Sequence, residues 1–324
     1  MLKYIIKRIL LMIPVLLGVS FFVFTLLYFA PGDPAAIVLG GDATPEAILA
    51  WRTEQGLEDP FFVQYFNFIW GVISRFDFGT SYTTGKEVTG QLMSAFPITL
   101  TLALPVTIIA VIIGTALGIL AAYHRGGVID AIARFVGIVG VSVPTFWAAP
   151  MLILLFSVTL QLLPVSGWYG PRYAVLPIMS MSLYAIAANL RMARSSVLEC
   201  MRQDYVVTAK AKGVDGKRLT FKHILKNALI PVITNAGISF GTMMGGSLVM
   251  DQIFSIPGLG ILLVTAVKSR DYPQIRGSVL LLAVTFSVIN LLVDILYAFL
   301  DPRIKAQFQS KNKKKVKIEK KEAA

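Results

Sequence analysis

Few side chains in this sequence could do chemistry. The two histidines, His124 and His223, lie far apart, and Cys200 is the single cysteine, so we expect neither a metal centre nor an internal disulfide. Segment 213–218 (GVDGKR) has the wrong spacing for a phosphate-binding loop and lacks Ser or Thr after its lysine. No Ser-His-Asp set, HExxH motif or pair of catalytic carboxylates is found, and we therefore expect no enzyme site and no nucleotide-binding loop in this chain.

Polar side chains inside long apolar runs are the remaining candidates for function. The run 228–250 carries three of them on one helical stripe: Asn235, Ser239 and Thr242. Three glycines fall on nearly the opposite stripe: Gly237, Gly241 and Gly245. The glycines would permit close approach of another helix. The polar stripe needs partners that hydrocarbon does not provide, and either a water-filled translocation path or interhelical hydrogen bonds would supply them.

A second polar stripe lies in the last apolar run, 277–300. It holds Ser287, Asn290 and Asp294. An ionised Asp at the bilayer centre costs about 2.5–3.5 kcal/mol, so we expect Asp294 to face the helix bundle. A role in the path and a structural bond are both open. We favour the structural bond, because Arg303 follows closely and offers a cation.

Composition identifies the class of protein. The chain of 324 residues is 56% hydrophobic and only 15% charged, which is too little polar surface to face water all round. The net charge of +12 is distributed in clusters between apolar runs, and this distribution argues against nucleic acid as a partner. We therefore predict an all-α integral membrane protein with several spans.

Six transmembrane helices are expected. The first, Ile9–Ala30, has 22 residues, longer than the ~7–15 of a signal-peptide core. The other five apolar runs are 96–123, 135–163, 174–190, 228–250 and 277–300. If successive loops lie on alternate sides of the membrane, 23 of the 30 Lys and Arg residues lie inside and 7 outside, Arg276 among the latter. None lies within an expected span. This asymmetry predicts that both termini are cytoplasmic.

The segments between the spans divide the chain further. Residues 31–95 hold eight acidic and three basic residues, the profile of an external loop region. Within them, residues 59–70 (DPFFVQYFNFIW) predict a short helix on the outer membrane surface. Residues 96–304 form a five-helix core. The Lys-rich segment 305–324 is expected to be a solvated cytoplasmic tail, with contact to anionic membrane lipid as an alternative.

The basic segment 191–227 is the largest polar interval of the second half. Nine of the residues from Arg191 to Pro231 are Lys or Arg and three are acidic, which predicts a cytoplasmic loop. Helix-compatible stretches flank a break at residues 213–216 (GVDG), so we predict a helix, a turn and a second helix. A structured inward-facing element in a membrane protein suggests docking of a soluble partner.

Several motifs carry a family resemblance that covers nearly the whole chain, from the first helix to Ile304. Residues 204–213 (DYVVTAKAKG) followed by 224–231 (ILKNALIP) resemble the cytoplasmic "EAA" loop of ABC importer permeases, although Val207 stands where the glutamate would fall. The segments 30–35 (APGDPA), 77–82 (DFGTSY), 253–260 (IFSIPGLG) and 300–304 (LDPRI) resemble the branch that imports dipeptides, oligopeptides and nickel.

The resemblance implies a type I ABC importer permease fold in a bacterial or archaeal inner membrane. It implies these residues in the ATPase-coupling loop: Asp204, Thr208, Ala209, Ala211, Gly213 and Gly216. Near the external gate it places Asp251, Phe254, Pro257 and Gly258. Implied partners are a second homologous permease subunit, two cytoplasmic ATPase subunits that bind ATP and Mg²⁺, and an extracytoplasmic substrate-binding protein.

Peptides are the substrate class that the resemblance implies first, with nickel chelates and glutathione behind them. A different class of function is a secondary transporter that works without ATPases. Such transporters are marked by charged residues inside helices or by an inverted repeat. Only Asp294 fits the first mark, and we find no repeat, so the ATP-driven permease is favoured.

Overall fold

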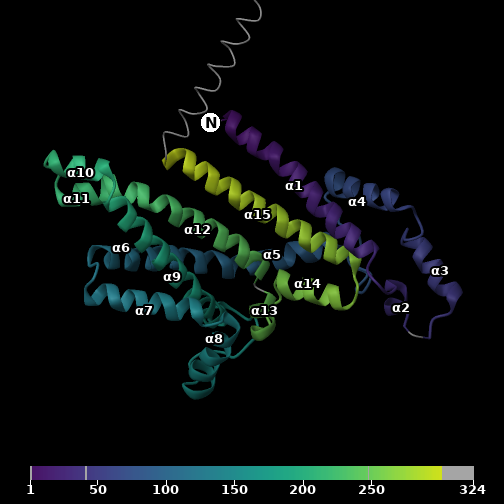
Figure 1. The fold of residues 1–324 in the computed structure, drawn as a ribbon. Coiled ribbons are helices and arrows are strands. Elements are labelled where there is room, and N and C mark those ends of the chain that lie inside the picture. Colours follow the sequence, from purple (N-terminus) through teal and green to yellow (C-terminus); the bar gives the residue numbers. More distant parts are fainter. Residues whose placement is uncertain (1, 41, 247, 301–324) are drawn as a thin grey trace, which may run out of the picture.

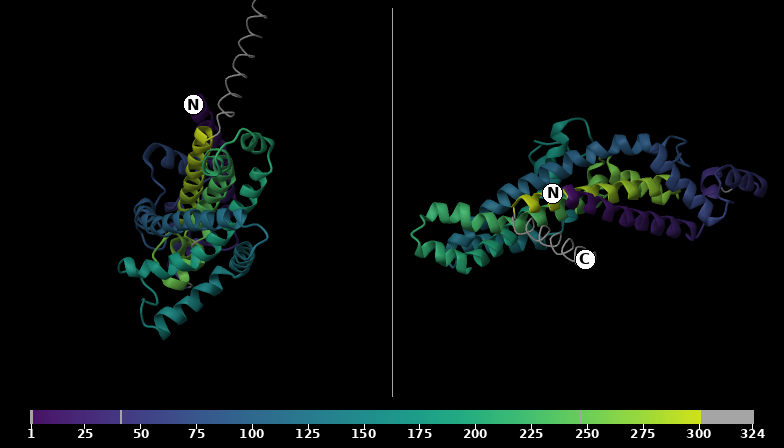
Figure 2. Two further views of the ribbon diagram at one scale, coloured as in Figure 1. Left: turned by 90° about the vertical axis from the view of Figure 1, so that its left-hand side faces the viewer. Right: turned by 90° about the horizontal axis from the view of Figure 1, so that it is seen from above.

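The computed structural model describes residues 2–40, 42–246 and 248–300. These residues form helices and one isolated β-bridge, between Thr80 and Glu87. The long helices run side by side, with α10 and α11 at one end of the molecule and α2 and α3 at the other (Figures 1 and 2). The expected signature at 301–304 and the tail 305–324 lie outside the described residues.

The helices of the first half are α1 (Leu2–Tyr28), α2 (Pro34–Leu39), α3 (Pro45–Glu54), α4 (Phe61–Arg75), α5 (Val88–Ile109), the π-helix η1 (Ala110–Gly114), α6 (Thr115–Tyr123), α7 (Val128–Ser142), α8 (Thr145–Leu152) and the π-helix η2 (Ile153–Thr159). Those of the second half are α9 (Pro171–Met201), α10 (Asp204–Ala211), α11 (Gly216–Arg218), the π-helix η3 (Leu219–Ile224), α12 (Leu225–Gly246), α13 (Leu248–Phe254), α14 (Leu259–Lys268) and α15 (Tyr272–Leu300).

Five described helices are long and apolar enough to cross a membrane, and two bent helix pairs bring the number to as many as seven. The five are Ile5–Tyr28, Val88–Tyr123, Pro171–Met201, Gly216–Gly245 and Tyr272–Leu296. All-helical membrane architecture is thus confirmed, whereas the count of six and the cytoplasmic termini stay predictions.

The expected span 135–163 corresponds to a bent pair of helices. The helix starts earlier, at Val128, and α7 and α8 meet at a bend of 97° between Ser142 and Thr145. Pro144 causes the break, because a residue before proline avoids the helical region. Val143 accordingly has extended backbone angles, with φ −78° and ψ 117°. The apolar run of the sequence includes this proline, so hydropathy alone does not show that the helix bends there.

Helix α9 is the central helix of the bundle, and α5, α6, α7, α8 and α12 all pack on it. A Cβ atom at Gly118 of α6 would lie 2.6 Å from the carbonyl oxygen of Leu190 in α9. At Gly140 of α7 it would lie 2.6 Å from Cβ of Ala187. Glycine therefore lets two helices approach α9 more closely than any side chain would permit.

The glycine stripe of α12 packs on α15, as its position predicted. A Cβ at Gly237 would lie 2.2 Å from Val293, and one at Gly241 would lie 2.1 Å from Phe286. At Gly245 nothing lies within 4 Å. Two of the three glycines are therefore needed for the contact between these helices.

A buried ion pair ties the start of α7 to α9. Asp130 is 1% exposed. Its carboxylate accepts hydrogen bonds from Arg194 Nε at 2.5 Å and Nη2 at 2.9 Å, and from the backbone N–H of Gly126 at 3.0 Å. Such two-point pairing fixes orientation as well as distance.

The region 31–95, predicted to be external, is attached to the bundle through aromatic contacts. Rings of α1 and α4 pack edge to face, as for Phe21 with Tyr65 and Tyr28 with Phe61. Arg276, expected in the loop before the last span, instead lies in the second turn of α15, because that helix begins at Tyr272. Its guanidinium carbon is 4.9 Å from the ring centre of Phe68 in α4, an attraction that favours a cation here.

Replacing Gly118 tests the close approach to α9. In Gly118→Ala the new methyl group meets the Leu190 carbonyl oxygen, so we expect the free energy of unfolding to fall by about 1–3 kcal/mol. Gly245→Ala is the matched control, because nothing lies within 4 Å of its Cβ position. Thermal unfolding of the purified proteins measures both, and equal midpoints would contradict the packing argument.

Candidate functional site

The predicted helix, turn and helix of the basic segment are present. α10 is followed by a turn at Gly213, whose φ of +73° lies in the left-handed region that favours glycine. A second helix begins at Gly216 and runs on into α12. Val206 and Ala209 anchor α10 in a hydrophobic cluster with Val197 of α9 and other residues: Leu219, Ile224, Leu225 and Ala228. The element is thus packed directly on two long helices.

One face of α10 is left uncovered. It carries Asp204, Val207, Thr208 and Ala211, all exposed. Ala209, one of the residues implied in the ATPase-coupling loop, is only 8% exposed and faces the bundle. Val207 is 59% exposed, although it was noted from the sequence only for replacing a glutamate. An exposed valine in the middle of a polar segment is the signal that sequence reasoning missed.

Tyr205 lies at the edge of this face. Partial burial raises the pKa of its phenol above the ordinary value, and contacts with Asn227 and Cys200 modify the shift. Because the ordinary value is already about 10, the side chain stays neutral at physiological pH. It joins the uncovered face as a hydrogen-bonding group without charge.

The three residues of the polar stripe of α12 lie in different environments. Asn235 donates to the side-chain oxygen of Asn189 in α9 at 3.4 Å, and Asn189 is 1% exposed. Ser239 is half-buried, whereas Thr242 is exposed and donates only to the Ser239 carbonyl at 2.8 Å. Asn235 therefore forms an interhelical hydrogen bond, whereas Thr242 has no partner on another helix among the described residues. Asn189 was not singled out from the sequence.

Asp294 pairs with an arginine at the other end of the chain. Arg8 of α1 makes two contacts of 3.0 Å with its carboxylate. The pair lies beside Asn290 in a cavity of about 250 Å³ between α1 and α15. Arg303, the cation expected from the sequence, lies outside the described residues. The structural role is favoured, since the pair fastens α1 to the bundle.

The predicted gate segment folds back onto the protein. Phe254 and Leu259 are fully buried, whereas Pro257 at the tip is exposed. Asp251 accepts a hydrogen bond from the backbone N–H of Gly260 at 3.1 Å, and Thr99 of α5 accepts one from that of Leu259 at 2.9 Å. Residues 251–260 therefore form a hairpin, here called the gate hairpin, that is fixed to α5.

Gly258 of the gate hairpin lies too close to neighbouring side chains to carry a side chain of its own. A Cβ at Gly258 would lie 2.7 Å from the carboxylate of Asp251 and 2.9 Å from the hydroxyl of Thr99. Thr99 is fully buried, and nothing in the apolar run distinguishes it from the nearby Thr101.

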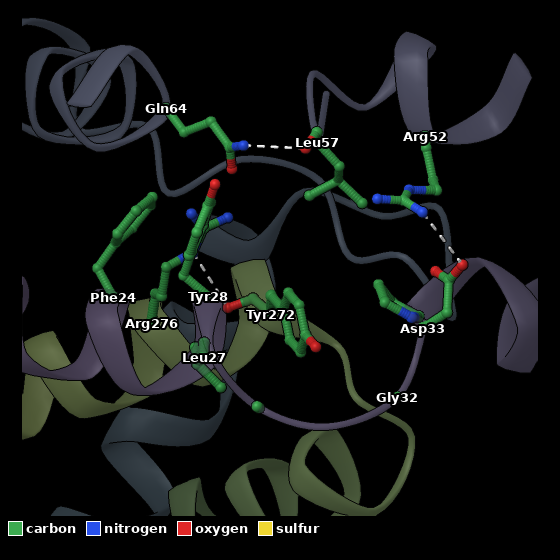
Figure 3. Close-up of a pocket in the computed structure, with 12 residues that line it drawn as sticks. Phe24, Leu27, Tyr28, Gly32, Asp33, Arg52, Leu57, Gln64, Tyr272 and Arg276 are labelled. Carbon is green, nitrogen blue, oxygen red and sulfur yellow. Dashed lines mark hydrogen bonds and ion pairs between the residues drawn. The ribbon is translucent and has the colours of Figure 1, made fainter. Parts of the chain in front are cut away.

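A cavity of about 320 Å³ lies where α1, α15 and the external region meet (Figure 3). Arg276 lines it together with Tyr28, Gln64 and Tyr272. Asp33 and Arg52 lie across the cavity, 3.8 Å apart. No three His, Cys, Asp or Glu side chains gather into a metal site within the described part of the chain.

The helical arrangement is one already known in transport proteins. A chain of the methionine ABC transporter MetNI, solved in inward-facing conformations, is 18% identical to this chain with a TM-score of 0.53. The match covers 65% of this chain and 97% of that chain. The shared feature is the fold of an ABC importer subunit.

Two family descriptions together match almost the whole sequence. Residues 114–306 match the binding-protein-dependent transport system inner membrane component, and residues 1–103 match the N-terminal part of such membrane components. The chain belongs to this family of ABC importer permeases and is a multi-pass inner-membrane transport subunit. The resemblance recognised in the sequence is thereby confirmed.

Relatives of similar length have names that refer to two kinds of cargo. A Brucella abortus (strain 2308) protein named "Putative peptide transport system permease protein" is 40% identical over 310 residues, covering 93% of this chain and 98% of the relative. The glutathione transport system permease protein GsiC of Salmonella choleraesuis is 40% identical over 305 residues, covering 94% and 99%.

Thr99→Val tests the attachment of the gate hairpin. The change keeps the shape but removes the acceptor of the buried Leu259 N–H, so we expect a loss of about 1–3 kcal/mol in the free energy of unfolding. Faster hydrogen exchange at Leu259 should accompany it. Thr101→Val on the same helix is the control, because that exposed hydroxyl bonds only to its own helix at Pro97. Similar effects from both variants would contradict the proposed attachment.

Exchanging Arg8 and Asp294 tests whether their ion pair holds α1 to α15. Each of Arg8→Asp and Asp294→Arg alone places like charges together and should lower the thermal midpoint. The double variant restores opposite charges and should recover most of the loss, giving an interaction energy of roughly 0.5–3 kcal/mol in the double-mutant cycle. Additive losses would show that the pair does not hold α1 to α15.

Proposed function

We propose that this chain forms half of the translocation path of an ATP-driven importer for dipeptides or oligopeptides. Relatives at 40% identity carry both the peptide and the glutathione names. Glutathione is itself a tripeptide, so a short peptide is the chemistry common to both names. Glutathione and nickel chelates are the narrower alternatives for the cargo.

The observation that carries the proposal is the uncovered face of α10. It lies at the end of the bundle opposite α2 and α3 (Figure 1). The buried side of the same helix packs against α9, η3 and the start of α12. A partner that pushes on α10 therefore pushes on the helices that bear the polar stripe and the gate hairpin.

The proposed partner subunits supply the ATP-binding sites that this sequence lacks. Because no phosphate-binding loop occurs in the chain, ATP and Mg²⁺ are bound in two cytoplasmic ATPase subunits that dock on α10. A second, homologous permease subunit completes the path. An extracytoplasmic binding protein delivers the peptide to the external region, and coupling between delivery and ATP turnover is reciprocal.

Gly213→Val tests the role of the turn after α10. A β-branched residue at φ +73° costs on the order of 1–3 kcal/mol, so α10 is displaced and ATPase association should weaken by roughly tenfold. Gly40→Val is the matched control, because Gly40 also has a positive φ, +89°, and no atom within 4 Å of its Cβ position, but follows α2 at the other end of the molecule (Figure 1). Pull-down of the ATPases and ATP-dependent peptide uptake in vesicles are the measurements.

Two results would count against the proposal. Unchanged uptake by Gly213→Val at normal expression would show that α10 is not where the ATPases act. Uptake by the purified chain without any ATPase would instead favour a secondary transporter.

A further inference from the structure

A groove of about 880 Å³ lies beside the gate hairpin. One wall is formed by the start of α5 and the residues before it, including Lys86, Glu87, Gln91 and Ser94. The other wall runs from Pro257 of the gate hairpin to Thr265 of α14. Pockets that bind small molecules measure about 300–1,000 Å³, so the groove is large enough for a short peptide.

The wall formed by the gate hairpin is fixed in place. Its backbone is hydrogen-bonded to Thr99, on the buried side of α5, through the Leu259 N–H at 2.9 Å. Gly258 could not carry a side chain without meeting Asp251 and Thr99. The groove is therefore a built feature of the fold, with one wall on α5 and the other on an element tied to α5.

The rim of the groove carries one charge of each sign. Lys86 and Glu87 are adjacent and exposed. Among the described residues, neither side chain has an ion-pair partner. Deeper in the groove, Gln91 and Ser94 follow on the same side of α5, within the candidate span Val88–Tyr123. Polar groups on an uncovered face of a span suit a water-filled path better than lipid.

We propose that this groove is the outer entry of the translocation path and that Lys86 and Glu87 select peptides by their free ends. Lys86 attracts the terminal carboxylate and Glu87 the terminal ammonium, while Ser94 and Thr265 offer hydrogen-bonding groups to the peptide backbone. The inference rests on the proposed function and adds to it a substrate class, short zwitterionic peptides, and the residues that recognise them.

The test compares three probes in the complete transporter with its ATPases and binding protein. The probes are trialanine, trialanine amide and N-acetyl-trialanine. Lys86→Gln should lower the uptake of trialanine relative to its amide by about two- to fivefold, the scale of a solvent-exposed ion pair. Glu87→Gln should lower uptake relative to the N-acetyl form instead. Arg75→Gln, an exposed cation outside the groove, is the control and should change neither ratio.

A second measurement does not depend on transport. Ser94→Cys in a Cys200→Ser background is labelled with a hydrophilic maleimide, and trialanine presented by the binding protein should slow the labelling. An unchanged labelling rate would overturn the inference.

The outcomes separate the two proposals. If ATP-dependent uptake persists but neither charge variant shifts its ratio, the groove does not read peptide ends, and the proposed function stands. If Lys86→Gln or Glu87→Gln instead prevents association with the second permease, the groove is a subunit contact and the inference is overturned. Absence of ATP-dependent uptake of all three probes by the unaltered complex would overturn both.

Discussion

Direct contact between helix backbones at α9 is the constraint on which the rest of the structure depends. Inside a bilayer no hydrophobic force drives helices together, so close packing must hold them. Gly118 of α6 and Gly140 of α7 meet α9 where a side chain would not fit. The buried Asp130–Arg194 pair then fixes the rotation of α7 on α9. α9 is thus the reference against which the other helices are placed.

The two ends of the bundle are secured by different means. At the end bearing α10, an apolar cluster that includes Val206 and Ala209 joins α10 to α6, α9, η3 and α12. At the gate hairpin, single hydrogen bonds to buried groups such as Thr99 and Asp251 hold an otherwise irregular backbone. Irregular backbone at membrane depth requires such partners, because hydrocarbon offers none. Apolar contact can shift as a unit, whereas the hydrogen-bonded hairpin has one defined position.

Most of the helical architecture could be predicted from apolar periodicity, and the helix, turn and helix of segment 191–227 from glycine placement. The differences between expectation and structure have identifiable physical causes. Pro144 bends the apolar run 135–163, and the length of the run alone does not reveal that bend. Asp294 found Arg8, almost the whole chain away, rather than a cation nearby in sequence. Ala209 faces inward because α10 has a buried side that a short mixed sequence does not mark. Long-range pairing and the rotation of a short helix depend on tertiary contacts that no local pattern encodes.

The contacts of α12 indicate how a push on α10 would be distributed. α12 has 22 residues, about 33 Å of helix. Near α10 it is joined firmly to α9, where Ser196 donates to the Ala228 carbonyl at 2.9 Å beside the apolar cluster. Further along, Asn235 donates to Asn189 of α9 at 3.4 Å, whereas Gly237 packs tightly on α15. Packed helices can slide past one another by small shear displacements. We therefore expect a push on α10 to move α12 against α9 first near Asn235, where the hydrogen bond between the two helices is 3.4 Å long rather than 2.9 Å.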